Sequence, residues 1–84
     1  MDEEQKILIN RINSLCKSAG YSYYMLADKS GVPLSTLMHL MDGSVKNPGI
    51  LTIIRICNGF GITMAEFFDT EAFNSMVAGI NIEG

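Results

Sequence analysis

The chain has 84 residues, with six Lys and Arg, nine Asp and Glu, one His and two Cys. A chain of this length forms one domain and buries only roughly 60 to 65% of its unfolded surface, which excludes a multidomain enzyme and an enclosed substrate chamber. With 48% hydrophobic and 18% charged residues, it has the composition of a folded domain and not of a disordered tail.

The first two predicted helices follow from apolar spacing and from the residues at their ends. Over residues 5–19 the apolar positions recur at steps of three and four, the period of one helical face, and Gly20 ends the run. Ser22 can cap the free N–H groups of a second helix over residues 23–30, which Gly31 then interrupts.

The next three predicted helices complete a five-helix bundle. Pro33 favours the first turn of a third helix over residues 33–42, because its missing N–H costs nothing there. Residues 50–60, from Ile50 onward, are helical in period and too apolar for a surface element, which predicts a central helix. The Thr63-x-x-Glu66 pattern is a capping box and begins a fifth helix at about residue 64. Residues 70–84 are expected to add only an amphipathic turn or two.

The joint between the second and third helices has the spacing of a helix-turn-helix. Ala27 is small where the third helix must cross close to the second, and Gly31 can take a positive φ in a short turn. Leu37 and Leu40 anchor the third helix from behind. The combination therefore predicts an all-α fold with a central helix-turn-helix, and an exposed outer face on the third helix.

The stretch from about Leu8 to Asp69 resembles the Cro/cI-like, lambda-repressor-type helix-turn-helix family, also called the xenobiotic-response-element type. The similarity lies in Arg11-Ile12-x-x-Leu15, Gly20-Tyr21-Ser22, Leu26-Ala27, Ser30-Gly31-Val32-Pro33, Ser35-Thr36-Leu37, Leu40, Gly43, Asn47-Pro48, Ile53-x-x-Ile56-Cys57 and Phe60-Gly61-Ile62-Thr63-x-x-Glu66-Phe67. The resemblance implies a DNA-binding domain over residues 1–69, with the helix 33–42 in the major groove and commonly a dimer on a near-palindromic operator.

Helical geometry predicts which side chains of residues 33–42 face the bases. Ser35 and His39 point outward and can hydrogen-bond to base edges, while Leu34 and Met38 can contact thymine methyl groups. Asp42 also points outward, where its carboxylate should repel phosphates. Since hydrogen-bonding groups are few on this face, groove shape is expected to contribute to recognition.

Contacts with phosphates are expected from helix starts and from basic residues around that face. The predicted positioning residues are Arg11, Ser22, Tyr23, Thr36, Lys46 and Asn47. Two of these residues have alternative roles. Arg11 could be an ordinary solvated charge, and Tyr23 could be a packing residue beside Tyr21 and Tyr24. Charge is also segregated along the chain, because residues 5–58 carry six bases and two acids, whereas the ends carry seven acids and no base.

Catalysis, metal and cofactor binding are not expected. Ser35 and His39 could touch across one helical turn, but no orienting acid or oxyanion pocket accompanies them. Cys16 and Cys57 have too few ligands nearby for zinc, so two buried reduced thiols are expected. A lone exposed His39 could alternatively sense pH by adding phosphate attraction when protonated.

The segment 70–84 is a candidate dimerisation segment. The predicted dimer residues are Phe67, Phe68, Phe73, Met76 and Val77, which could alternatively fold back on the core of their own chain. The acidic start of the chain and the short apolar stretch around Arg55 predict a cytoplasmic protein without a leader or membrane span.

Two functions remain open from the sequence. The first is a sequence-specific regulator of transcription, a repressor that binds double-stranded DNA as a homodimer without a small-molecule ligand. The second is a protein-interaction module, adaptor or antitoxin-like, that keeps the fold and binds DNA weakly or not at all. Low net charge and six methionines favour the second.

Overall fold

The computed structural model describes residues 2–81, and the side chains of residues 2–76. Within this part the chain is entirely helical, with α1 (Glu3–Ala19), α2 (Tyr23–Ser30), α3 (Leu34–Met41), α4 (Ile50–Phe60), α5 (Met64–Phe68) and α6 (Glu71–Asn81). The predicted second and fourth helices have the observed bounds, and the fifth begins at residue 64 as predicted. The first begins two residues earlier than predicted, and the third is one residue shorter at each end.

The predicted count of five helices is wrong, because α6 is a helix of 11 residues in place of one or two turns. Its first turn is held by Thr70, whose Oγ1 accepts a hydrogen bond from Phe73 N at 3.3 Å. The Phe73 ring then packs edge-on against Phe68 at 4.9 Å between centroids. These contacts hold the first turn of α6, although Gly79 lowers the helix propensity by about 1 kcal/mol.

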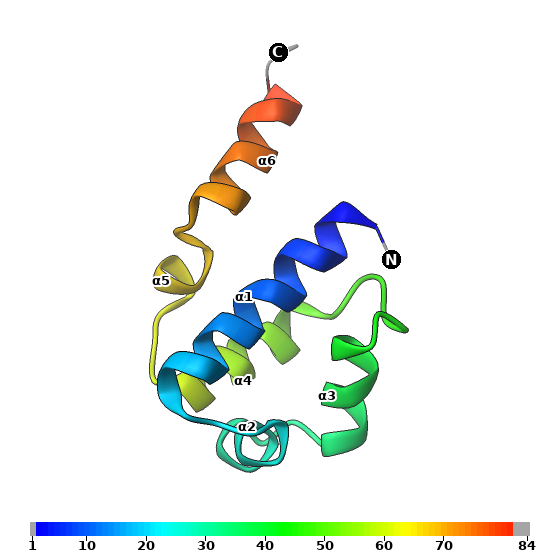
Figure 1. Cartoon of the computed structure of the whole chain (residues 1–84), viewed down its shortest axis with the longest axis vertical. Helices are drawn as coiled ribbons and strands as arrows, with labels where there is room; N and C mark the ends of the chain where they lie inside the picture. Colours follow the sequence, from blue (N-terminus) through cyan, green and yellow to red (C-terminus); the bar gives the residue numbers. More distant parts are fainter. Residues whose placement is uncertain (1, 82–84) are drawn as a thin grey trace.

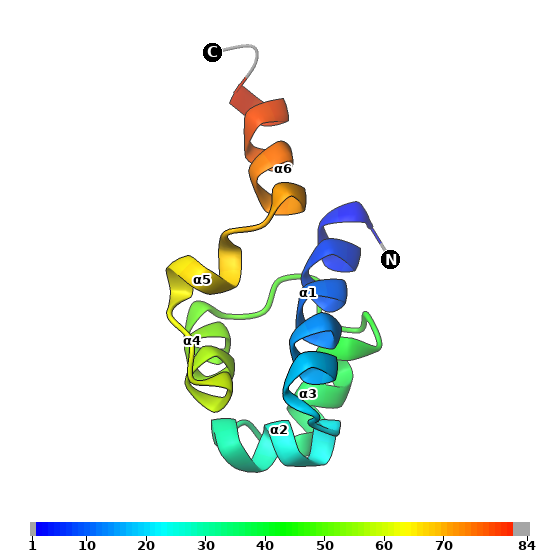
Figure 2. The same cartoon turned by 60° about the vertical axis from the view of Figure 1, so that its left-hand side comes forward.

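Helices α1 to α5 form a bundle from which α6 projects. In Figures 1 and 2, α2 crosses below the lower ends of α1 and α4, and α6 extends away on the opposite side. This projection gives the described chain a long dimension of 42 Å against 25 and 21 Å in the other directions.

Each of the first five helices contributes one completely buried large side chain to a single core. These are Ile12, Leu26, Leu37, Ile56 and Phe67, in chain order. The predicted buried thiols are confirmed, since Cys16 and Cys57 are free and buried, and desolvation raises the pKa of both thiols.

A very close approach between α2 and α4 explains a glycine inside a helix. A Cβ atom added at Gly59 would lie 2.9 Å from Ser30 Cβ and 3.0 Å from Ser30 N. No side chain fits in that space, so glycine permits the close packing of α4 on α2. This packing also positions α3, which follows α2 after the turn.

Candidate nucleic-acid interface

The turn between α2 and α3 is set by a left-handed glycine and a buried serine. Gly31 has φ +73° and its N–H donates to Ala27 O at 3.0 Å, as the sequence predicts for this position. Ser30 Oγ donates to Ala27 O and accepts a hydrogen bond from Val32 N at 3.2 Å. Val32 is buried, so the turn is held on both sides and the direction of α3 relative to α2 is fixed.

Helix α3 has one buried face and one exposed face. Leu37, Leu40 and Met41 lie in the core. The opposite side exposes all of the predicted base-contacting residues, with Leu34 and Met38 keeping 41% and 42% of their surface. Ser35, Thr36 and His39 are also exposed there. The structure therefore leaves all five side chains accessible on α3, with Thr36 on its flank.

The C-terminal end of α3 carries a fixed negative charge. Asp42 Oδ1 accepts a hydrogen bond from Ser44 N at 2.8 Å. Hydrogen bonding by the Ser44 side chain, together with this backbone contact, holds the pKa of the Asp42 carboxyl below its usual value. Asp42 Oδ2 lies 3.8 Å from Nδ1 of His39, one turn earlier. Asp42 therefore stays ionised near neutral pH, at the edge of the surface that includes His39.

The loop between α3 and α4 is bound by Gln5 of α1, a residue that no sequence motif had indicated as part of the site. Gln5 is buried, and its Nε2 donates to Gly43 O at 3.0 Å and to Val45 O at 3.4 Å. Its Oε1 accepts a hydrogen bond from Asp2 N, which completes a capping box at the start of α1. The Asp2-x-x-Gln5 pattern signals the cap, but nothing local signals the contact with the loop.

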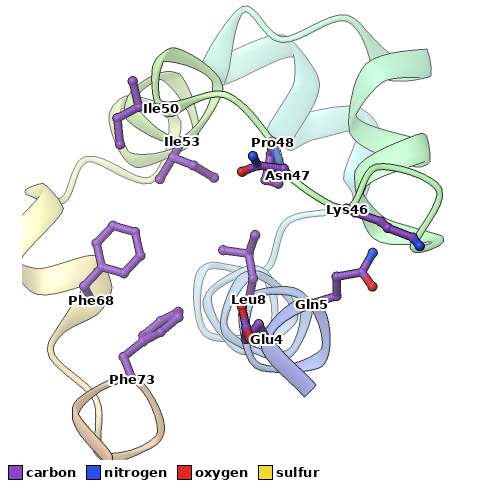
Figure 3. Close-up of a pocket in the computed structure, with 10 residues that line it drawn as sticks. All are labelled: Glu4, Gln5, Leu8, Lys46, Asn47, Pro48, Ile50, Ile53, Phe68 and Phe73. Atoms are coloured by element: carbon purple, nitrogen blue, oxygen red, sulfur yellow. The ribbon is translucent and has the colours of Figure 1, made fainter. Parts of the chain in front are cut away.

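Lys46 and Asn47 are exposed on this loop, as expected for residues that meet a phosphate. They form one wall of an apolar pocket of about 420 Å³ between α1, the loop, the start of α4 and the α5–α6 connection. In Figure 3 the Leu8, Ile53, Phe68 and Phe73 side chains face this pocket, whereas the Lys46 ammonium points away from it. The Lys46 charge is thus directed outward from the bundle.

Two predicted positioning residues at the start of α2 use their hydroxyl groups internally. Ser22 Oγ accepts a hydrogen bond from Met25 N at 3.1 Å and caps the helix. The Tyr23 hydroxyl donates to Asn13 Oδ1 of α1. A contact between this helix start and an anion would therefore come first from backbone N–H groups in the first turn.

Arg11 is not part of the exposed α3 surface. Its Nε donates to Phe67 O and its Nη2 to Glu66 O, both at 2.8 Å. The guanidinium thereby joins α1 to the end of α5. Arg11 is therefore not a purely solvated charge, because two carbonyl groups bind two of its five N–H donors. The flanking phosphate contact stays a prediction.

The predicted dimer residues differ in how deeply their side chains are buried. Phe67 and Phe73 are buried in the core of their own chain, so these two do not supply exposed apolar surface. Phe68 and Met76 are half-buried against the same core. The Val77 side chain lies outside the described residues. For Phe67 and Phe73, folding back on the core is the alternative that the structure shows.

Outside α3, exposed apolar side chains lie instead on α4, and on α2 at Tyr24 and Met25. Ile50 and Leu51 keep 60% and 64% of their surface, and Ile54 keeps 37%. The expectation that Ile50 belongs to the buried side of this helix is wrong, because it lies in the first turn, at the rim of the pocket beside the loop. Helical spacing identified the correct period but not the width of the buried face.

Neither a metal centre nor a membrane span is found in the part of the chain that the structure describes. No three His, Cys, Asp or Glu residues there are close enough to hold a metal ion. No described helix is both long and apolar enough to cross a bilayer. The described surface offers an exposed helix face, with helix starts and the loop that carries Lys46 beside it.

The comparisons with known proteins agree with this geometry. The family model described as helix-turn-helix matches residues 12–67, which are 56 of the 84 residues and include α2, α3 and the turn between them. No curated protein and no solved structure matches the chain.

Proposed function

Since the chain belongs to the Cro/C1-type helix-turn-helix family of DNA-binding regulators, we propose that it regulates transcription by sequence-specific binding of double-stranded DNA. It would bind with α3 in the major groove. The family is one of regulators and not of enzymes. DNA binding also requires access to the genome, so we propose a cytoplasmic location.

The observation that carries the proposal is the exposed face of α3. Leu37, Leu40 and Met41 fix the helix from behind, so its other side is rigid and free to enter a groove about 12 Å wide. On that side the Ser35 hydroxyl and the His39 imidazole are the hydrogen-bonding groups proposed to read base edges. Leu34 and Met38 supply the apolar contacts.

Phosphate contacts are proposed at three places around α3. Backbone N–H groups at the start of α2, beside Ser22 and Tyr23, form the first. Lys46 and Asn47 on the loop held by Gln5 form the second, and Thr36 on the flank of α3 forms the third. Arg11 is left out of this set, because its guanidinium binds the end of α5.

A more specific part of the proposal is that the protein represses transcription as a homodimer. The protein would act by occupying a promoter, and two copies would read two half-sites of a near-palindrome. Support for a dimer comes from the exposed apolar residues Ile50 and Leu51 on α4. Light scattering across a concentration series tests it, and a monomeric mass at every concentration would remove the dimer.

The test of DNA binding is selection from a random duplex library at low salt, followed by titration of the best site across a salt series. Enrichment of one motif, with affinity that falls as salt rises, is the expected result. A folded protein that enriches no sequence would overturn the proposal.

A matched pair of charge reversals tests the position of the interface. Lys46→Glu should weaken binding by about ten-fold or more, because the outward Lys46 charge faces the DNA. Lys29→Glu changes the net charge equally at another place, where the ammonium lies over the Tyr21 ring at 5.5 Å from its centroid. It should weaken binding much less.

A protein-interaction module is the second candidate, favoured by the exposed apolar residues of α4. Ile50 and Leu51 are more exposed than the apolar residues of α3. Under this function Leu51→Ser would abolish partner capture, and Lys46→Glu would leave it intact. Under the DNA-binding function, Lys46→Glu would weaken DNA affinity, whereas Leu51→Ser would leave it unchanged in a monomer and weaken it in a dimer.

A further inference from the structure

The exposed face of α3 consists of an apolar row beside a polar row. Leu34 and Met38 are four residues apart, so they lie one above the other on the helix surface, and both are about two-fifths exposed. Ser35, His39 and Asp42 form the polar row next to them. The two rows would meet different parts of a base-pair edge.

The polar row has little hydrogen-bonding capacity left for bases. Asp42 Oδ1 already accepts a hydrogen bond from Ser44 N, and its Oδ2 lies 3.8 Å from His39 Nδ1. Its negative charge also opposes close approach to phosphates. The uncharged hydrogen-bonding groups of the row are the Ser35 hydroxyl and the His39 imidazole, which is a small set for reading several base pairs.

The apolar row has a chemically specific counterpart in the major groove. Among the substituents on the major-groove edges of the four bases, the C5-methyl group of thymine is the apolar one, cytosine carries only hydrogen at C5, and the others are hydrogen-bond donors and acceptors. Covering a donor or acceptor with a leucine or methionine side chain would desolvate it without a partner and cost free energy. The row therefore favours a methyl group and disfavours the other edges.

Resting on the proposed function, we propose that Leu34 and Met38 make this protein a reader of C5-methylated pyrimidines in its operator. Opposite this row, thymine and 5-methylcytosine would be preferred to uracil and unmethylated cytosine. The Cβ atoms of residues four apart on a helix are about 5–6 Å apart, compared with 3.4 Å between successive bases. The two side chains thus span one or two base steps per half-site.

Base analogues separate methyl reading from hydrogen-bond reading. After selection of an operator, each thymine is replaced singly by deoxyuridine, which removes the methyl group and keeps the O4 acceptor. At the same position, 5-methylcytosine paired with guanine keeps the methyl group and replaces O4 by an amino group. We expect uracil to weaken binding about four-fold per methyl group at one or two positions per half-site, and 5-methylcytosine to bind more tightly there than cytosine.

Protein variants assign the effect to the apolar row. Leu34→Ala and Met38→Ala should each bring the affinity ratio of thymine to uracil close to one at one position. Met25→Ala is the matched control, because it removes an almost equally exposed methionine from α2, and it should keep the wild-type ratio. Since the readout is a ratio of two duplexes on one protein, a general loss of affinity does not imitate the result.

The possible failures are distinguishable. A protein that binds no DNA would overturn the proposed function and this inference together. An operator without thymine, or one bound equally well with uracil at every position, would overturn the inference and leave the proposed function standing. Discrimination that persists in both alanine variants would overturn the assignment to Leu34 and Met38.

Discussion

Arg11 of α1 is bound to the last turn of α5 through Phe67. Its Nε donates to Phe67 O at 2.8 Å, and its Cζ lies 5.9 Å from the centroid of the Phe67 ring. A cation at the C-terminal end of a helix satisfies carbonyl groups that have no partner within the helix. This residue therefore holds the first and fifth helices together across the core.

Replacement of Arg11 by alanine is expected to lower the free energy of unfolding by about 1–3 kcal/mol. The variant loses two charge-assisted hydrogen bonds and the packing of the guanidinium on Phe67. Urea denaturation measures the change, with Lys17→Ala as an exposed control in the same helix that should stay within about 0.5 kcal/mol of wild type. Equal effects of the two variants would contradict a structural role for Arg11.

Gln5→Ala should weaken both folding and DNA binding. The buried amide holds the carbonyl groups of Gly43 and Val45, and its loss leaves them without that donor in the loop that carries Lys46. A loss of about 1–3 kcal/mol in unfolding free energy is expected, with faster amide exchange across residues 43–47. Lys6→Ala, an exposed neighbour, is the control, and an unchanged exchange rate in Gln5→Ala would refute the loop contact.

The close contact between α2 and α4 predicts that alanine is tolerated at Gly49 but not at Gly59. Gly59→Ala places a Cβ 2.9 Å from Ser30 Cβ and should destabilise the fold by about 1–3 kcal/mol, although alanine is the better helix former. Gly49→Ala meets no atom within 4 Å and has φ −66°, so it should cost less than about 1 kcal/mol. Thermal unfolding of both variants compares them, and a stable Gly59→Ala would show that α2 and α4 can separate there.

Asp42→Asn is expected to strengthen DNA binding by about two- to ten-fold at fixed salt. The amide oxygen can keep the hydrogen bond from Ser44 N, so the end of α3 is preserved while a negative charge near the phosphates is removed. Asp69→Asn removes the same charge between α5 and α6 and should have a much smaller effect. Unchanged or weaker binding by Asp42→Asn would place this end of α3 away from the DNA.

Acid should weaken the cap of α5. Glu66 Oε1 accepts a hydrogen bond from Thr63 N at 3.0 Å, and this bond lowers the pKa of Glu66 below its ordinary value of 4.5. Because the pKa is lower in the folded state, the stabilisation is complete above about pH 4.5 and is lost as pH falls through the folded-state value.

Glu66→Gln tests this dependence, since glutamine keeps the acceptor without a titrating group. The difference in unfolding free energy between pH 7 and pH 3 should be smaller in Glu66→Gln than in wild type. Asp28→Asn, an exposed acid in α2, serves as the control and should keep the wild-type difference. A Glu66→Gln variant with the full wild-type difference would show that the cap does not titrate.

Much of the local structure was determined by the sequence alone. Apolar period, the Ser22 and Thr63 caps and the glycine stops predicted where the helices begin and end, because these signals act within one or two turns of the chain. Gly31 predicted the left-handed turn before α3 for the same reason. The exposure of Ser35 and His39 followed once Leu37 and Leu40 were recognised as the buried side of α3.

Only the tertiary structure decided which surfaces are covered and which side chains are already engaged. Arg11 and Phe67, like Gln5 and Gly43, lie far apart in the sequence, so no local pattern pairs them. Helical period gives the direction of an apolar face but not the neighbour that covers it, which is why Ile50 was expected inside and Phe67 at a dimer surface. The physical reason is that burial and hydrogen bonding between helices depend on how the helices meet, and that arrangement is a property of the whole folded chain.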